Sequence, residues 1–135
     1  MNLQFVLSYF GILPFLIILF DKFFFKLLDY NIVNDFCIFY SIIIFVFIGA
    51  VNWNLKKNIS ILDVLIGFMP SLASVLIIII FLYSYEVINY LIILFIIQLI
   101  LDSFIYNEKK DRIIFYQLRI PLTSTILLSL IFIQL

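Results

Sequence analysis

Residues 61–82 read ILDVLIGFMPSLASVLIIIIFL, and this stretch decides the fold. Its one charged residue, Asp63, lies near the start, and the rest exceeds the roughly 18 apolar residues that mark a membrane-spanning helix. The hydrocarbon core of a bilayer has no water to bond exposed backbone groups, so a single spanning segment has to be helical. The stretch therefore predicts a transmembrane helix.

Apolar stretches of similar length lie on both sides of this segment. We expect five spans, at about 3–20, 36–54, 61–82, 87–105 and 116–134. None of them alternates apolar and polar residues with period 2, which disfavours a β-barrel. The predicted fold class is all-α, a single domain over residues 1–135 that forms an integral membrane bundle of five transmembrane helices.

The composition agrees with a membrane protein and argues against several classes of function. Of the 135 residues, 67% are hydrophobic and 12% charged, whereas soluble domains are about half apolar and a quarter charged. The chain has no histidine, one cysteine (Cys37) and three isolated glycines. These counts disfavour haem and zinc sites, disulfides, iron–sulfur centres and a phosphate-binding loop. For the same reasons we expect no cofactor, no metal and no enzymatic activity. The zero net charge and the lack of a basic stripe argue against a nucleic-acid partner.

Residues 22–30, KFFFKLLDY, allow two interpretations. They extend the first span, with Lys22 and Lys26 reaching to the membrane surface, or they form a short amphipathic helix that lies flat on it. We favour the flat-lying helix slightly.

The distribution of basic residues predicts the orientation. With five spans, the loops at 54–60 and 106–119 share the side of the N-terminus. They carry Lys56, Lys57, Lys109, Lys110, Arg112 and Arg119. The opposite side has only Lys22 and Lys26. Because cytoplasmic loops are enriched in lysine and arginine, we expect the N-terminus in the cytoplasm and the C-terminus outside.

The polar stretch FIGAVNWNLKKNISILD, residues 47–63, resembles an ordinary membrane loop in most respects. Trp53 occupies the place of an interfacial aromatic residue. Ser60 and Asp63 have the spacing of a capping box that opens the third helix. Gly49, Asn52 and Asn54 are less well explained by a loop.

Small residues in the third span indicate close helix packing. Gly67 and Ser71 form a small-xxx-small pair, which lets another helix approach. Pro70 should kink the helix and leave a carbonyl without its donor one turn earlier. We assign Gly49, Gly67, Pro70 and Ser71 to helix packing, in preference to a binding site at a broken helix.

Polar residues at one membrane face form a candidate cluster. Gln98 and Asp102 lie four residues apart, so they share a helical face. The cluster consists of Asn52, Trp53, Gln98, Asp102 and Arg119. Three interpretations stay open: Asp102 and Arg119 are separate interfacial anchors, they form a pair that ties two helices together, or the cluster is a transport or catalytic site.

Five short motifs occur in a particular order along nearly the whole chain. They are YFGILPF (9–15), GAVNW (49–53), MPSLAS (69–74), QLILD (98–102) and LRIPLT (118–123). In this order they resemble the small polytopic proteins of bacteria and mitochondria related to transmembrane protein 69, a domain family of unknown function. That family tends to have a double glycine before the tryptophan and a glycine after it, where this chain has Gly49-Ala50 and Asn54. The resemblance implies helical spans and a membrane location, and no activity.

Together these features favour a non-enzymatic accessory, assembly or stabilising subunit of the bacterial inner membrane, with the mitochondrial inner membrane as the alternative location. The partners would be the bilayer and another membrane protein. The alternative function is a binder or transporter of a small lipophilic molecule, a lipid or a quinone, at the polar cluster.

Overall fold

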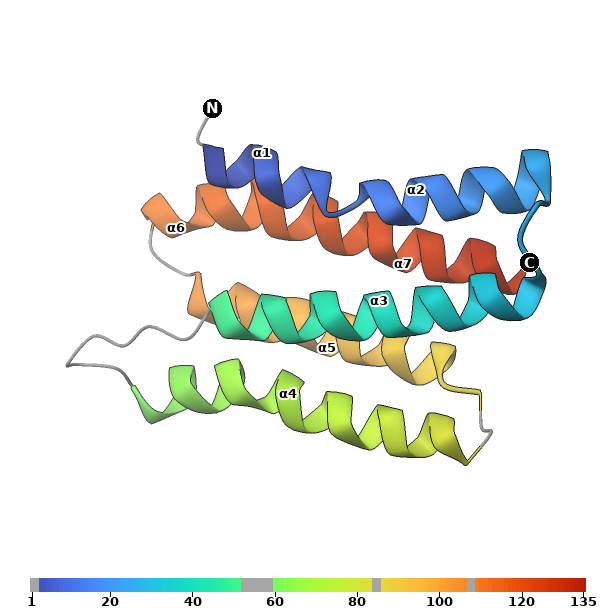
Figure 1. The fold of residues 1–135 in the computed structure, drawn as a ribbon. Helices are drawn as coiled ribbons and strands as arrows, with labels where there is room; N and C mark the ends of the chain where they lie inside the picture. The colour runs from blue at the N-terminus through green and yellow to red at the C-terminus, as the bar shows by residue number, and fades with distance from the viewer. Residues whose placement is uncertain (1–2, 52–59, 84–85, 107–108) are drawn as a thin grey trace. The chain divides into compact units, whose positions relative to one another are not determined.

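The computed structural model of the chain describes residues 3–51, 60–83, 86–106 and 109–135 (Figure 1). Its elements, with η marking a π-helical turn, are α1 (Leu3–Phe10), α2 (Leu13–Phe20), η1 (Asp21–Phe25), α3 (Tyr30–Val51), α4 (Ile61–Leu82), α5 (Ile88–Ile105), α6 (Lys109–Ile114), η2 (Phe115–Arg119) and α7 (Ile120–Gln134). No strand occurs in these described ranges, so the predicted all-α fold class is confirmed.

Within the described residues, five helical segments are long and apolar enough to cross a bilayer, as expected. They are Val6–Phe25, Tyr30–Val51, Ile61–Leu82, Ile88–Ile105 and Arg112–Gln134. The second segment begins at Tyr30, before the expected position near 36. Asn31 and Asp35 therefore lie exposed in its first two turns, where a helix end at the headgroups tolerates polar side chains.

The structure corrects the flat-lying helix that we favoured for residues 22–30. Asp21–Phe25 instead continue the first span as a π-helical turn, and the helix ends at Lys26, which has a left-handed backbone (φ 52°). The Lys26 amide donates to the Asp21 carbonyl at 2.6 Å. The Asp21 carboxylate accepts from the amides of Leu27 (3.3 Å) and Leu28 (3.1 Å). Asp21 thus bonds three amides that follow the helix, which ends the segment in a tight turn.

The described chain divides into two compact units, and each is considered by itself. The first comprises Met1–Cys37 with Asp102–Leu135, and the second comprises Ile38–Leu101.

In the first unit, α2 runs alongside α7, and the C-terminus lies beside the end of the first span (Figure 1). The Lys22 ammonium donates to the carbonyls of Phe132 (3.1 Å) and Ile133 (2.5 Å). These carbonyls belong to the last turn of α7, where intrahelical donors are missing and a positive charge is favoured. The rings of Phe23 and Phe132 meet edge to face at 6.3 Å between centroids. Lys22 therefore ties the two terminal spans together, and this long-range contact favours continuing the first span over a helix that lies flat.

In the second unit, aromatic pairs join α3 to its neighbours. Phe39 meets Phe81 of α4 at 5.3 Å between ring centroids, and Phe45 meets Phe95 of α5 at 5.2 Å. Both pairs are edge to face, the arrangement that aromatic rings prefer. Phe45 and Phe95 are fully or almost fully buried, so they form the centre of this unit.

Helix α4 stays continuous through Pro70. The hydroxyl of Ser74 donates to the Pro70 carbonyl at 2.7 Å, a back-bond that serine makes to the preceding turn. At the start of the helix, the Ser60 hydroxyl accepts from the Asp63 amide at 3.2 Å. The expected serine half of the capping box is therefore confirmed.

Candidate functional site: a buried charge pair

Asp102 and Arg119 are the two charged side chains that lie deepest in the described structure. Asp102 is near the end of α5, and Arg119 ends the π-helical turn η2. Their side chains are 2% and 6% exposed, and 3.7 Å separates Arg119 Nε from Asp102 Oδ2. The structure thus brings together two residues of the predicted cluster.

Tyr106 completes this site, and the sequence analysis missed it. Arg119 Nη2 donates to the Tyr106 hydroxyl at 3.2 Å. The guanidinium carbon also lies 5.7 Å from the centre of the Tyr106 ring, within range of a cation–π contact. The backbone amide of Tyr106 donates to the Asp102 carbonyl at 3.0 Å, so the tyrosine follows Asp102 by one helical turn. That four-residue spacing was the one signal that could have indicated it.

A π-helical turn determines where Arg119 points. The Ile120 amide donates to the Phe115 carbonyl, five residues earlier, in place of the usual four. Pro121 follows in the first turn of α7, where its missing amide is tolerated. From Arg119 onward the buried face continues through Thr123, Ile126, Leu130 and Ile133. Arg119 therefore begins the stripe by which the last span is buried.

Each charge of this pair is tolerated in its buried position because the opposite charge lies beside it. Removing two ions from water costs several kcal/mol each, about as much as their attraction recovers at low dielectric. Breaking such a pair is costly, because the remaining charge stays buried without compensation. The pair therefore favours one arrangement of η2 beside the end of α5, whether or not it also binds a ligand.

The remaining predicted members of the cluster are Asn52, Trp53 and Gln98. Asn52 and Trp53 lie outside the described residues. Gln98 is 3% exposed and precedes Asp102 by one turn on α5, and it belongs to the second compact unit. Thr123, one turn after Arg119, is also buried. The ion pair and the hydrogen bond described above join Asp102, Tyr106 and Arg119.

Three of the four predicted packing residues, Gly49, Gly67 and Pro70, meet at a close approach of α3 and α4. A methyl group added at Gly49 would lie 2.6 Å from Pro70 Cγ and 2.9 Å from the Gly67 carbonyl oxygen. Gly49, Gly67 and Pro70 are buried, whereas Ser71 is half-buried. Ser74, rather than Ser71, continues the buried face of α4. Gly49 is therefore the residue whose missing side chain allows the contact.

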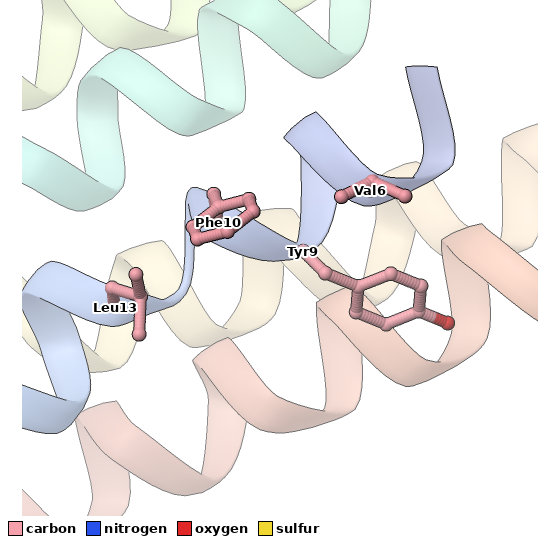
Figure 2. Close-up of a pocket in the computed structure, with 4 residues that line it drawn as sticks. All are labelled: Val6, Tyr9, Phe10 and Leu13. Atoms are coloured by element: carbon pink, nitrogen blue, oxygen red, sulfur yellow. The ribbon is translucent and has the colours of Figure 1, made fainter. Parts of the chain in front are cut away.

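A shallow apolar depression lies at the break between α1 and α2. It is lined by Val6, Tyr9, Phe10 and Leu13 (Figure 2). The Tyr9 side chain points away from Phe10 toward the last helical span, where its hydroxyl donates to the Gln117 carbonyl. The described residues include no group of three or more histidine, cysteine, aspartate or glutamate side chains that could hold a metal ion.

These helices define the class of the molecule, a multi-pass α-helical membrane protein with five candidate spans. The model of the family described as "Protein of unknown function (DUF3429)" matches residues 2–135, so the chain belongs to that family. No curated protein and no solved structure matches the chain.

Proposed function

We propose that this protein is a non-enzymatic accessory, assembly or stabilising subunit that acts through its helix surfaces. The observation that carries this proposal is the charge pair. Asp102 and Tyr106 contact the Arg119 guanidinium, so the charge is compensated within the chain's own helices. Polar groups in membrane helices that pair with one another hold those helices together.

Other polar contacts support the same function. Ser74 and Ser129 donate to backbone carbonyls of their own helices, and Lys22 donates to the end of α7. Lys22 thereby joins the two terminal spans, and the serine hydroxyls find their acceptors within their own helices, while the outward faces of the spans stay apolar. On α4 the exposed side chains include Leu65, Leu72 and Leu76. Such a face fits the hydrocarbon of a bilayer or the apolar surface of another membrane helix.

The location and finer relationship are part of this proposal. We infer that the protein lies in the bacterial inner membrane, or alternatively the mitochondrial inner membrane, with its N-terminus in the cytoplasm and its C-terminus outside. The supporting observation is the excess of lysine and arginine in the loops on the N-terminal side. Within the family, the five ordered motifs support a grouping with proteins related to transmembrane protein 69.

Site-specific photo-cross-linking in native membranes tests the subunit proposal. A photoreactive amino acid is placed at Leu72 on the exposed face of α4, and at Ser74 on its buried face as the matched control. We expect one discrete protein adduct from position 72 and none from position 74. The same probe is then moved over exposed positions of the other spans. Adducts with lipid alone from every exposed position would refute the proposal.

A specific observation favours a second candidate, the binding of a lipid or quinone headgroup. Ionisable side chains buried in membrane spans mark ligand or ion sites in many proteins. The 3.7 Å between Arg119 Nε and Asp102 Oδ2 also exceeds the roughly 2.7–2.9 Å of a short charge-assisted hydrogen bond. Native mass spectrometry of the purified protein tests this candidate. A retained lipid or quinone that is lost from Arg119→Gln and kept by Lys26→Gln would support it, and equal retention by both variants would refute it.

A further inference from the structure

Pro121 leaves one carbonyl of the last span without its usual donor. In an α-helix each carbonyl accepts from the amide four residues later, and proline has no amide hydrogen. Helix α7 resumes α-helical geometry at Ile120, and in that geometry the carbonyl that faces Pro121 is four positions earlier, at Gln117. The Gln117 carbonyl instead accepts a hydrogen bond from the Tyr9 hydroxyl, which comes from a different helix. A side chain from the N-terminal helix thus takes the place of the missing backbone donor.

This replacement lies within the π-helical turn that presents Arg119. Gln117 is the middle residue of Phe115–Arg119. A π-turn contains one more residue than an α-turn, so it rotates the residues beyond it by about 100° relative to an uninterrupted helix. If the turn relaxed to α-helical geometry, Arg119 and the helical residues before Phe115 could not both keep their present orientations. The geometry of the charge pair therefore depends on the local hydrogen bonds of Gln117.

We propose that Tyr9 is a positioning residue. Its hydrogen bond to the Gln117 carbonyl, called the latch below, stabilises the π-helical turn and so orients Arg119 toward Asp102 and Tyr106. The N-terminal helix then controls the buried charge pair. Tyr9 lies just before the break between α1 and α2, which Gly11 and Pro14 accompany. It also lines the depression of Figure 2, so a movement of α1 or an apolar molecule in that depression would act on the latch. The proposal goes beyond the subunit function and stands whether the charge pair serves packing or ligand binding.

A double-mutant cycle between Tyr9 and Pro121 tests the latch. Tyr9→Phe removes the hydroxyl and keeps the ring. We expect it to raise the unfolding equilibrium constant in detergent about threefold to tenfold. Pro121→Ala restores an amide that can bond the Gln117 carbonyl, so Tyr9→Phe should have almost no effect in that background. Tyr90→Phe, at an exposed tyrosine of α5, is the matched control and should change little in either background. Equal effects of Tyr9→Phe in both backgrounds would overturn the proposal.

A carbonyl signal gives a readout that does not depend on stability. The chain has four glutamines, at 4, 98, 117 and 134, so carbonyl-¹³C glutamine labelling gives few NMR signals. The Gln117 signal is the one that Gln117→Leu removes. Tyr9→Phe should shift it upfield and leave the Gln98 signal in place, while Tyr90→Phe should leave both unchanged. If the Gln117 signal does not move in Tyr9→Phe, the hydroxyl does not bond that carbonyl and the latch is refuted. If Tyr9→Phe fails to fold, the Pro121→Ala background decides: the added amide should restore folding to Tyr9→Phe, and a double variant that also fails to fold would overturn the proposal.

Discussion

Gly49→Ala is predicted to destabilise the protein, although alanine is the better helix former. The added methyl group would lie 2.6 and 2.8 Å from two ring carbons of Pro70 and 2.9 Å from the Gly67 carbonyl oxygen. Carbon atoms normally approach to about 3.5–4.0 Å. A proline ring and a backbone carbonyl cannot rotate away as a flexible side chain can. Helices α3 and α4 would therefore have to separate locally.

The two contributions to this change have opposite signs. Overpacking of a tight contact costs about 1–3 kcal/mol. Replacing glycine by alanine inside a helix gains up to about 1 kcal/mol. Subtracting about 1 kcal/mol of helix propensity from the cost of overpacking leaves a net loss of up to about 2 kcal/mol in the free energy of unfolding. A loss of stability in Gly49→Ala therefore indicates the close contact, whereas a gain indicates helix propensity alone.

Reversible unfolding in mixed detergent micelles measures this change. Ala50→Gly, at the exposed neighbouring position of α3, is the matched control, since it reports the helix propensity alone. We expect both variants to be less stable than the unmodified protein. If Gly49→Ala is instead more stable, by about as much as Ala50→Gly is less stable, the close approach of α3 and α4 does not exist.

Three further predictions follow from other contacts. Gly67→Leu should lower the free energy of unfolding by about 1–3 kcal/mol through overpacking, while the volume-conserving Ile77→Leu should lower it by less than about 1.5 kcal/mol. Equal thermal stability of the two variants in detergent would show that Gly67 faces lipid. Lys22→Met should lower the free energy of unfolding by about 1 kcal/mol, because the last carbonyls of α7 lose a charged donor. Lys26→Met should have a smaller effect, and the reverse order would contradict the contact between Lys22 and the end of α7. Alkaline phosphatase fused after Leu135 should be active and a fluorescent protein fused there should stay dark, and the opposite pattern would overturn the expected orientation.

The spans were predictable because a bilayer imposes a simple rule on sequence. A run such as residues 61–82 is too long and too apolar for any other common structure, so its helix needed no knowledge of its neighbours. The region after Asp21 was harder, because both interpretations have the same local composition. The contact that decides between them joins Lys22 to Phe132 and Ile133 at the other end of the chain. No local pattern contains that information.

The candidate site was predictable in part for the same reason. Asp102 and Arg119 end and begin consecutive spans, so topology alone indicated that they could lie close together. Tyr106 follows Asp102 by one turn, but eight tyrosines in an aromatic-rich chain gave it no distinction. The bond from Tyr9 to the Gln117 carbonyl depends on a π-helical turn and on two helices at opposite ends of the sequence. Such a contact arises from tertiary packing, which residue spacing does not encode.

The most direct test of the buried charge pair is a double-mutant cycle on Asp102→Asn and Arg119→Gln, measured as the free energy of unfolding in detergent. Each single variant leaves the partner charge buried, so we predict a loss of about 3 kcal/mol or more for each. The double variant should lose less than the sum of the two, by about 1–3 kcal/mol, because it removes both charges at once. Single effects that add to within about 0.5 kcal/mol would contradict the pair and leave Asp102 and Arg119 as independent residues.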